Sequence, residues 1–555
     1  MPSATHTMTT APAPTLPSVA GELLRRHWGF DALRPLQAES IAATLAGRDS
    51  LTVLPTGGGK SLCYQLPPLV TGRVTVVVSP LIALMQDQVA GLRLAGVPAA
   101  AIHSNMAEGE AAKARAMAGS GELRLMLVAP ERLLAPGGEF LRFIEKLKPG
   151  AIAIDEAHCI SQWGHDFRPE YRRLRELRNV LPGIPIAAYT ATATPRVRED
   201  IVAQLHLQKP AVMVGVFDRP NLTYRILPRI DLGEQAAEAI RRHPGGAAIV
   251  YCISRKDTEA LAKDLTHAGL KASAYHAGMD GAERSRISQA FRDEKVNIVV
   301  ATVAFGMGID RPDVRCVIHA AMPKTVEGYQ QETGRAGRDG EPAECLMLYS
   351  AGDVVRWKKV MEMGAAEQVV MGEREGPGGH LAAQFALLEE MHKFAGGVRC
   401  RHRAISEYFG QEYPKPDCGA CDVCLKELEE VQGGHEAAQK IISCVARCGQ
   451  SFGAAHIVEV LAGADTEKVR QRGHNQLSTY GLLRGWARER ISAAINQLVD
   501  SGDLARAAGE FPVIQLTEQS VAVLKNQRTA TLLMPKRAIG ATAKEKAATR
   551  GEPEL

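Results

Sequence analysis

The chain has 555 residues, of which 45% are hydrophobic and 23% are charged, and its formal net charge is only +4. This length supplies more than one hydrophobic core, so we expect three or four domains. The sequence has no apolar window of about 18 residues and no basic start followed by an apolar stretch, which argues against membrane spans and secretion. Nucleic-acid binding cannot be inferred from so small a net charge. It would have to be inferred from local clusters of basic residues.

A glycine-rich loop follows the first predicted strand. The apolar run Leu51–Leu54 predicts a buried strand, and the sequence TGGGKS comes directly after Pro55. Glycines let backbone N–H groups approach an anion, while a lysine can reach the β/γ-phosphates and a serine hydroxyl can ligate Mg²⁺. The strict phosphate-loop pattern has glycine where Leu54 stands, so an ordinary glycine-rich turn is the alternative. The expected phosphate-binding residues are Thr56, Gly57, Gly58, Gly59, Lys60 and Ser61.

An acidic pair follows another buried strand, predicted at Ala151–Ile154. Parallel sheets bind ligands at the carboxyl ends of their strands, and Asp155 and Glu156 would emerge at such an end. We expect Asp155 to ligate Mg²⁺ together with Ser61, and Glu156 to orient the attacking water. The pair alone could be an acidic turn, but with the glycine-rich loop it indicates ATP hydrolysis.

The acidic pair runs straight into a basic and aromatic segment, SQWGHDFRPEY at residues 161–171. This adjacency suggests that hydrolysis is coupled to nucleic acid. Stacking of a base on an aromatic ring contributes on the order of 1–3 kcal/mol, enough to order a loop when a strand arrives. The residues expected to sense the strand are Trp163, His165, Phe167 and Arg168.

Buried-strand runs and helical patterns alternate twice, which predicts an α/β fold with two doubly wound parallel-sheet lobes. We place the boundary between the lobes near residues 214–217 and expect the nucleotide in the cleft between them. The predicted strands of the first lobe are Leu51–Leu54, Val74–Val78, Leu125–Val128, Ala151–Ile154 and Ile186–Tyr189. Those of the second lobe are Ala248–Tyr251, Ala272–Tyr275, Ile298–Ala301, Val314–His319 and Cys345–Leu348.

The segment QETGRAGRDG at residues 331–340 supplies two arginines to the second lobe. Arg335 and Arg338 are three residues apart, a spacing that suits one helical face. An arginine that neutralises charge on the γ-phosphate raises the rate of phosphoryl transfer by about 10³ to 10⁵. We expect both arginines to act in catalysis, with Arg338 as the candidate finger; an ordinary surface pair is the alternative.

Four cysteines near residue 400 have metal-ligand spacing, C-x₁₇-C-x₂-C-x₂-C. Four thiolates suit a closed tetrahedral zinc site, with disulfides and an iron–sulfur cluster as the alternatives. The expected ligands are Cys400, Cys418, Cys421 and Cys424. We interpret the remaining cysteines as small core residues, with a zinc role for Cys444 and Cys448 as the alternative.

The segment after the cysteines predicts a winged helix. Helical patterns at His435–Cys448, Ala454–Leu461 and Arg488–Ser501 precede a hairpin-like stretch at 504–514. Basic residues at its approach, such as Arg484, would contact phosphates, although a solvated basic face is the alternative. A glycine-rich, charged connector is expected at 361–380, and the polar tail from residue 526 is expected to be disordered.

A series of motifs runs along the chain: WGF at 28–30, TGGGKS, SPLIALMQDQV at 79–89, APERL at 129–133, DEAH with its aromatic loop, TATAT at 190–194, FDRPN at 217–221, YHAGM at 275–279, ATVAFGMGID at 301–310 and QETGRAGRDG. Through these motifs the chain closely resembles the RecQ family of superfamily 2 DNA helicases over most of residues 20–525. The resemblance implies two RecA-like lobes, a zinc-binding module and a winged helix, in a short form without a helical HRDC domain. Phe30, Arg34 and Gln37 match the adenine-reading motif of the family, in which the glutamine pairs with the base edge.

The resemblance also implies an activity and a domain arrangement. It implies an ATP-driven, Mg²⁺- and Zn²⁺-dependent motor that moves 3′→5′ on single-stranded DNA and unwinds duplexes in recombination and repair. We expect it in the cytoplasm at the nucleoid, with single-stranded-DNA-binding protein as a candidate partner; the wing would offer only Phe511 as a strand-separating aromatic. The alternatives are an ATP-switched remodelling or annealing factor and an RNA-directed ATPase. The expected segments are 1–18 (disordered), 19–214 (first lobe, ATP-binding), 215–350 (second lobe), 351–427 (zinc module), 428–525 (winged helix) and 526–555 (disordered tail).

Overall fold

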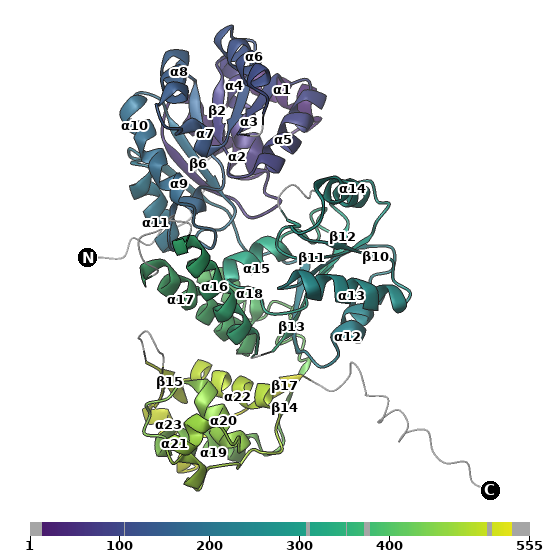
Figure 1. Cartoon of the computed structure of the whole chain (residues 1–555), viewed down its shortest axis with the longest axis vertical. Coiled ribbons are helices and arrows are strands. Elements are labelled where there is room, and N and C mark those ends of the chain that lie inside the picture. The colour runs from purple at the N-terminus through teal and green to yellow at the C-terminus, as the bar shows by residue number, and fades with distance from the viewer. Residues whose placement is uncertain are drawn as a thin grey trace, which may run out of the picture. The chain divides into compact units, whose positions relative to one another are not determined.

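The structure, a computed structural model, describes residues 14–104, 106–306, 311–350, 352–370, 378–507 and 513–535. The chain divides into two compact units, Met1–Phe217 and Asp218–Leu555 (Figure 1). The described part of each unit contains one large parallel sheet. Two sheets of this kind confirm the predicted α/β fold class.

In the described part of the first unit, parallel strands form one sheet in the order β3-β4-β2-β5-β6-β1-β7. Strands β1, β2, β4 and β5 are buried at every position, as expected for a parallel sheet covered on both faces. The strands are β1 Ser50–Val53, β2 Thr75–Val78, β3 Ala99–Ile102, β4 Leu125–Val128, β5 Ala151–Ile154, β6 Ile186–Thr190 and β7 Ala211–Val214. The helices are α1 Ser18–Trp28, α2 Gln37–Leu45, α3 Lys60–Gln65, α4 Pro67–Thr71, α5 Ile82–Leu94, α6 Glu108–Gly119, α7 Pro130–Leu133, α8 Glu139–Leu147, η1 Ala157–Ile160, α9 Pro169–Arg172, η2 Arg173–Arg175, α10 Glu176–Val180 and α11 Pro195–Gln204.

The sheet of the second unit has the order β10-β11-β9-β12-β13-β8, and its neighbouring strands are also parallel. His319, the last residue of β12, lies 2.8 Å from Glu332, which belongs to the QETGRAGRDG segment. The strands are β8 Leu222–Pro228, β9 Ala247–Tyr251, β10 Ala272–Tyr275, β11 Ile298–Ala301, β12 Val314–His319 and β13 Ala343–Tyr349. The helices that accompany them are α12 Leu232–Arg241, α13 Arg255–His267, α14 Gly281–Arg292 and α15 Val326–Thr333.

Every strand predicted for the two lobes is present, with ends within two residues of those expected. Three further strands, β3, β7 and β8, were not predicted. Strand β3 is Ala-Ala-Ala-Ile, and alanine does not favour strands. Strand β8 alternates buried and half-buried residues because it lies at the edge of its sheet, so it lacks the continuous apolar run of a central strand.

Two long helices follow the second sheet. The expected connector at 361–380 is wrong where it is described, because α16 continues to Val370 and α17 begins at Gly378; residues 371–377 lie outside the described residues. The remaining elements are α16 Gly352–Val370, α17 Gly378–Gly396, α18 Arg401–Tyr408, β14 Leu428–Glu430, α19 Gly434–Arg447, α20 Ala454–Ala462, α21 Glu467–Gln471, η3 His474–Gln476, α22 Arg488–Asp500, β15 Leu504–Arg506, β16 Ile514–Leu516, α23 Glu518–Leu524 and β17 Leu533–Pro535.

The C-terminal elements form a small helical core with a two-stranded hairpin. Helices α19, α20 and α22 bury residues such as Ile441, Val460 and Ile491, and β15 pairs antiparallel with β16. This is the predicted winged helix; Phe511 lies outside the described residues. Strand β17 pairs with β14, so the expectation of disorder from residue 526 is wrong through residue 535. Residues 536–555 and 1–13 lie outside the described residues.

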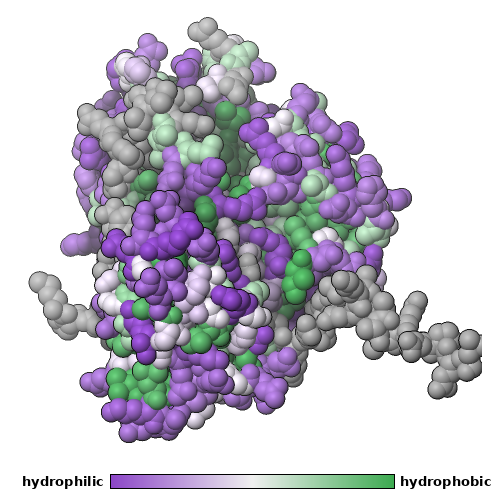
Figure 2. All heavy atoms as spheres, turned by 60° about the horizontal axis from the view of Figure 1, so that its bottom comes forward, coloured by the Kyte–Doolittle hydropathy of each residue, from purple (hydrophilic) through white to green (hydrophobic). Residues whose placement is uncertain are grey.

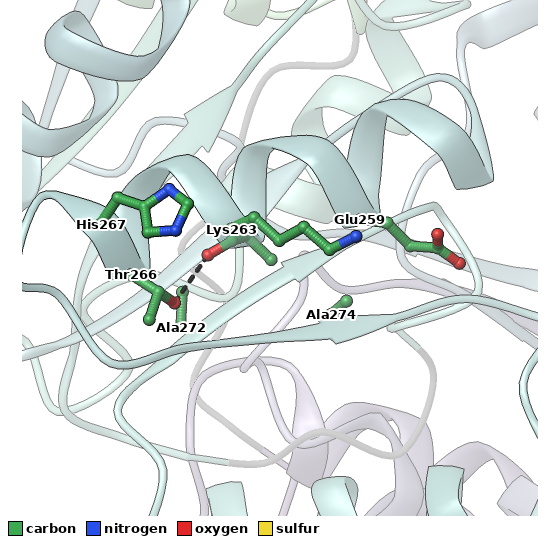
Figure 3. Close-up of a pocket in the computed structure, with 7 residues that line it drawn as sticks. Glu259, Lys263, Thr266, His267, Ala272 and Ala274 are labelled. Carbon is green, nitrogen blue, oxygen red and sulfur yellow. Dashed lines mark hydrogen bonds between the residues drawn. The ribbon is translucent and has the colours of Figure 1, made fainter.

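None of the helices in the described ranges combines the length and the apolar character that crossing a bilayer requires. On the face shown in Figure 2, hydrophilic residues predominate and hydrophobic residues form small patches. A cavity of about 330 Å³ lies between α13 and the edge strand β10 (Figure 3). It is lined by Glu259, Lys263 and small residues of β10, and none of the predicted site residues contributes to it.

Candidate nucleotide site, coupling loop and metal site

The glycine-rich loop lies between β1 and the start of α3. Gly57 and Gly59 adopt positive φ angles of 85° and 76°, which glycine accommodates without strain. A Cβ atom on Gly58 would lie 2.9 Å from the carbonyl oxygen of Pro55, so this position also requires glycine. Lys60 begins α3 and its Nζ donates to the carbonyl oxygen of Leu54 at 3.4 Å. The loop therefore has the close-approach backbone that a phosphate cradle needs.

The predicted adenine-reading residues lie directly against this loop. Gln37 begins α2, is 2% exposed, and donates from Nε2 to the carbonyl oxygen of Gly59 at 2.9 Å. Arg34 donates to the carbonyl oxygen of Gly57, while its backbone N–H donates to Gln37 Oε1 at 2.7 Å. Phe30 is 50% exposed. The structure thus brings two of the three residues into contact with the phosphate loop, a contact that the sequence did not predict.

Asp155 and Glu156 follow β5 as predicted, and their environments differ. Asp155 is buried, and its Oδ2 lies 3.3 Å from the hydroxyl of Tyr64. Burial and the charge of Glu156 raise the pKa of Asp155 to about 6, although Lys60 opposes this shift. Burial also opposes ionisation of Glu156, but its hydrogen bond with His158 and the charge of Lys60 lower its pKa to about 2. Glu156 is therefore the carboxylate that stays ionised.

A short chain of contacts leads from Glu156 into the aromatic loop. His158 Nδ1 lies 3.3 Å from Glu156 Oε2 and 2.9 Å from Thr190 Oγ1. The ring of His158 stacks on that of His165, with centroids 4.3 Å apart and an interplanar angle of 17°. Of these residues, only Glu156 and His165 were predicted as site residues. His158 and Thr190 were not, although they could have been found from the DEAH and TATAT motifs to which they belong.

The other predicted coupling residues are held by arginines and acids of the same unit. The guanidinium of Arg196, on α11, lies 3.3 Å from the ring centroid of Trp163, and that of Arg172 lies 5.1 Å from the ring of Phe167. Arg168 pairs with Asp166 at 3.1 Å and donates to the carbonyl oxygen of Pro80 at 3.0 Å. Sequence reasoning missed Arg196, which directly follows TATAT and Pro195.

Arg335 and Arg338 lie in the turns that follow α15, not on a helical face. The expectation of one helical face is wrong because α15 ends at Thr333 and Gly337 adopts a φ of 54°. Arg335 is buried and donates to the carbonyl oxygen of Gly306. Arg338 is half-buried. Both arginines lower the pKa of Tyr251, although burial outweighs them and raises it to about 12. Tyr251, the last residue of β9, donates from its hydroxyl to the carbonyl oxygen of Phe305 at 3.0 Å, and Arg335 contacts the next carbonyl, that of Gly306.

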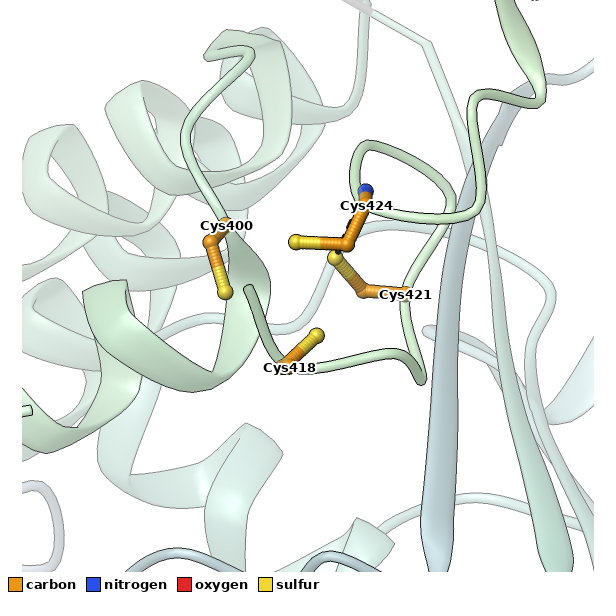
Figure 4. Close-up of side chains that lie close together, drawn as sticks. All are labelled: Cys400, Cys418, Cys421 and Cys424. Carbon is orange, nitrogen blue, oxygen red and sulfur yellow. Dashed lines mark hydrogen bonds between the residues drawn. The ribbon is translucent and has the colours of Figure 1, made fainter. Parts of the chain in front are cut away.

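The four predicted zinc ligands come together. Cys400 precedes α18, the other three lie on the loop before β14, and the four Sγ atoms point toward one another within 4.8 Å (Figure 4). A zinc ion with four thiolates at about 2.3 Å needs sulfur atoms roughly 3.8 Å apart, so the set fits a tetrahedral site after a small contraction. Backbone N–H groups of Ala420 and Cys424 donate to Cys418 Sγ and Cys421 Sγ at 3.3 and 3.4 Å, which stabilises thiolates.

The cysteine loop is joined to the second sheet. The backbone N–H of Tyr224 in β8 donates to the carbonyl oxygen of Ala420 at 3.1 Å, and Asp422 N–H donates to the carbonyl oxygen of Tyr224 at 2.9 Å. The buried Asp422 carboxylate pairs with Arg401 of α18 at 2.8 Å. Cys444 and Cys448 lie elsewhere, buried in the winged-helix core with their Sγ atoms 4.0 Å apart.

Four family models match the chain. They are described as a DEAD/DEAH box helicase at residues 34–201, a helicase conserved C-terminal domain at 231–340, a RecQ zinc-binding domain at 351–425 and an RQC domain at 429–539. The zinc-binding match includes all four clustered cysteines.

Known proteins are similar over nearly the whole chain. The ATP-dependent DNA helicase RecQ of Pasteurella multocida is 39% identical over 522 residues, which are 94% of this chain and 80% of that protein. The protein of the same name from Bacillus subtilis is 36% identical over 92% of this chain and 84% of its own length. A crystal structure of the DUF1998 helicase MrfA bound to DNA has a TM-score of 0.51 at 18% identity, over 72% of this chain and 59% of that one, which is similarity of fold. The chain belongs to the RecQ helicase family.

Proposed function

We propose that this protein is an ATP-dependent DNA helicase that moves 3′→5′ along single-stranded DNA and unwinds duplexes in recombination and repair. The observation that carries the proposal is the contact chain from Glu156 through His158 to His165. It joins the carboxylate that would orient the attacking water to the loop that would stack on DNA bases. A base that moves His165 would thereby move His158 and reorient Glu156.

The residues of the glycine-rich loop would hold the nucleotide. The backbone of Gly57, Gly58 and Gly59 would surround the phosphates, Lys60 would neutralise them, and Phe30, Arg34 and Gln37 would contact the adenine. When bound, Mg²⁺ would neutralise charge on the β- and γ-phosphates. Ser61 and Asp155 would hold it, and the raised pKa of Asp155 supports this role because a nearby cation relieves the cost of ionising a buried carboxyl.

Arg338 would reach the γ-phosphate, whereas Arg335 would support the turn. This division is supported by the exposure of the two side chains, because Arg335 is buried against Gly306 and Arg338 is half-buried. The tetrahedral cysteine set would hold one structural zinc ion, whose loss would release the loop from β8.

The DNA substrate would include both a single strand and a duplex. The aromatic loop suits a single strand, since stacking on rings is tolerant of sequence. The winged helix suits a duplex, since Arg484, Arg488 and Arg490 are exposed at the approach to α22. Such a substrate would place the protein at the nucleoid of the cytoplasm, with single-stranded-DNA-binding protein as a partner on the same strand.

Strand displacement tests the proposal. Duplexes with a 3′ or a 5′ overhang, one strand labelled, would be mixed with the protein and Mg²⁺-ATP, with Lys60→Ala as the control. Unwinding of the 3′-tailed duplex alone, lost in the control, is the expected result. DNA-stimulated hydrolysis without unwinding would indicate an ATP-driven remodelling factor and not a helicase. Stimulation of hydrolysis by RNA but not by DNA would indicate that the substrate is RNA.

A further inference from the structure

A partly buried ion pair connects the wing to a helix outside the winged-helix domain. Arg506, on the wing strand β15, pairs with Glu389 of α17, and the two side chains are only 10% and 21% exposed. The same guanidinium donates from Nη2 to Asn496 Oδ1 of α22 at 2.8 Å. One partly buried arginine thus joins the C-terminal end of the wing strand β15, helix α22 and helix α17.

The pair is continued by a chain of buried polar groups into the second lobe. Asn496 Nδ2 donates to His392 Nε2 at 3.3 Å, and His392 Nδ1 lies 2.9 Å from the hydroxyl of Tyr349 at the end of β13. Burial lowers the pKa of His392 to about 4, so its imidazole is neutral at physiological pH. A neutral imidazole has one acceptor and one donor nitrogen, and this chain uses both.

Close packing of the two helices accompanies these bonds. Gly396 ends α17 at the point of contact, where an added Cβ would lie 2.4 Å from Asn496 Nδ2 and 3.2 Å from Asn496 Cβ. On its other side, α17 packs on α15 through Phe394 and Tyr329, whose ring centroids are 5.4 Å apart. Helix α15 leads into the turns that carry Arg335 and Arg338. Helix α17 therefore lies between the arginine segment of the second lobe and the wing.

We infer that Arg506 is a positioning residue for duplex unwinding, because it fixes the wing hairpin to α17 so that movement of the second lobe is transmitted to the wing. The inference rests on the proposed helicase function. A salt bridge on the surface would have little effect, but a mostly covered arginine that also bonds an amide is held in one geometry, and loss of either partner leaves the other charge partly buried without its counter-charge. The wing would then swing independently of the lobe while ATP hydrolysis continued.

The test measures base pairs unwound per ATP hydrolysed, using the zinc-loaded full-length protein, a 3′-tailed duplex and Mg²⁺-ATP. In Arg506→Gln the ATPase rate stimulated by single-stranded DNA should stay within about twofold of wild type, while unwinding falls by about tenfold to a hundredfold, the size that misplacement of a working element causes. Glu389→Gln should give the same loss, and combining the two should add little. Arg506→Lys, which can still pair with Glu389, should recover part of the unwinding.

Arg528→Gln is the matched control, because Arg528 pairs with the buried Asp503 at 2.8 Å within the winged-helix domain. It should leave unwinding per ATP near wild type. Equal unwinding per ATP in wild type and Arg506→Gln would overturn the inference, as would equal losses in Arg506→Gln and Arg528→Gln. If Arg506→Gln does not fold, Gly396→Ala replaces it; this change should separate the helices and reproduce the loss, and normal unwinding in it would also overturn the inference. Absence of unwinding in wild type would instead refute the helicase proposal itself.

Discussion

His158 and His165 stack nearly parallel, with ring centroids 4.3 Å apart, and the first of them also lies 3.3 Å from the Glu156 carboxylate. His158 lies on η1, next to the acids that we expect to act in hydrolysis, and His165 lies among the aromatic residues that follow this helix. A change in the position of either ring must therefore alter the surroundings of Glu156. In the proposed helicase, this contact would couple hydrolysis to DNA binding within a single unit.

Replacing His158 should lower catalysis more than ATP binding. His158→Gln removes the stack on His165 and weakens the contact that holds Glu156, and loss of a hydrogen bond to a charged group costs about 1.5–3 kcal/mol, or roughly 10-fold to 100-fold in rate. We expect kcat of the DNA-stimulated ATPase to fall by that factor while the Kd for a fluorescent ATP analogue stays within about twofold. The exposed His267 provides a matched control, His267→Gln. A weakened Kd with an unchanged kcat would contradict the role of His158.

Replacing the loop aromatics should remove DNA stimulation without affecting the unstimulated rate. In Trp163→Ala or Phe167→Ala, a base loses a stacking partner that contributes on the order of 1–3 kcal/mol. The unstimulated ATPase rate should stay near wild type, and the rate at saturating single-stranded DNA should approach that unstimulated rate. Phe143→Ala on α8, an aromatic of the same unit outside the loop, is the control. Equal stimulation in Trp163→Ala and wild type would exclude a coupling role for Trp163.

The sequence was most informative where function depends on a contiguous motif. The glycine-rich loop and the acidic pair are such motifs, and the four cysteines follow a metal-ligand spacing, so these residues could be named before the structure was known. Contacts between distant segments could not be predicted, because no local pattern reports them. The bond from Gln37 to Gly59 and the stacking of Arg196 on Trp163 depend on the tertiary fold.

Local patterns also failed where two signals conflicted. A spacing of three placed Arg335 and Arg338 on one helical face, but Gly337 with its positive φ keeps the chain in turns. The glycine-rich and charged composition of 361–380 indicated a connector, yet α16 extends to Val370 because its N-terminal half packs on the second lobe, where Trp357 Nε1 donates to the carbonyl oxygen of Met322 at 2.7 Å. In the first case a single backbone angle outweighed the spacing of the arginines, and in the second case tertiary contacts outweighed the composition of the segment.

Removing one cysteine ligand should unfold the zinc module. Metal binding in such sites contributes roughly 10–16 kcal/mol of folding free energy, so Cys418→Ser should lose its zinc and lower soluble yield. The damage should extend to β8, whose Tyr224 exchanges backbone hydrogen bonds with the cysteine loop. Metal analysis would give one zinc per wild-type chain and much less than one in the variant. Cys444→Ser, which removes a thiol outside the cluster, should keep its zinc; a loss there would bring Cys444 into the metal site.

Acid should destabilise the winged helix through a buried histidine pair. His456 Nε2 lies 2.7 Å from His474 Nδ1, and His456 is only 3% exposed. Burial, followed by the charges of His474, Lys468 and Arg472, lowers the pKa of His456 to about 4 from its ordinary 6.5. Between about pH 4 and 6.5, His456 therefore binds a proton in the unfolded chain but not in the folded chain. The free energy of unfolding should be at its full value above about pH 6.5. It should decrease by up to roughly 3 kcal/mol as the pH falls toward 4.

Unfolding of the full-length protein monitored by tryptophan fluorescence between pH 4 and 7 measures this effect, because one of its four tryptophans, Trp486, packs against the same core. His456→Gln cannot gain a charge, so its stability should vary less with pH over that interval than the stability of wild type. His267→Gln should retain the full wild-type pH dependence, because the imidazole of His267 is exposed. Identical pH dependence in wild type and His456→Gln would mean that both states of the protein bind this proton equally, and that the acid sensitivity of the domain arises from other groups.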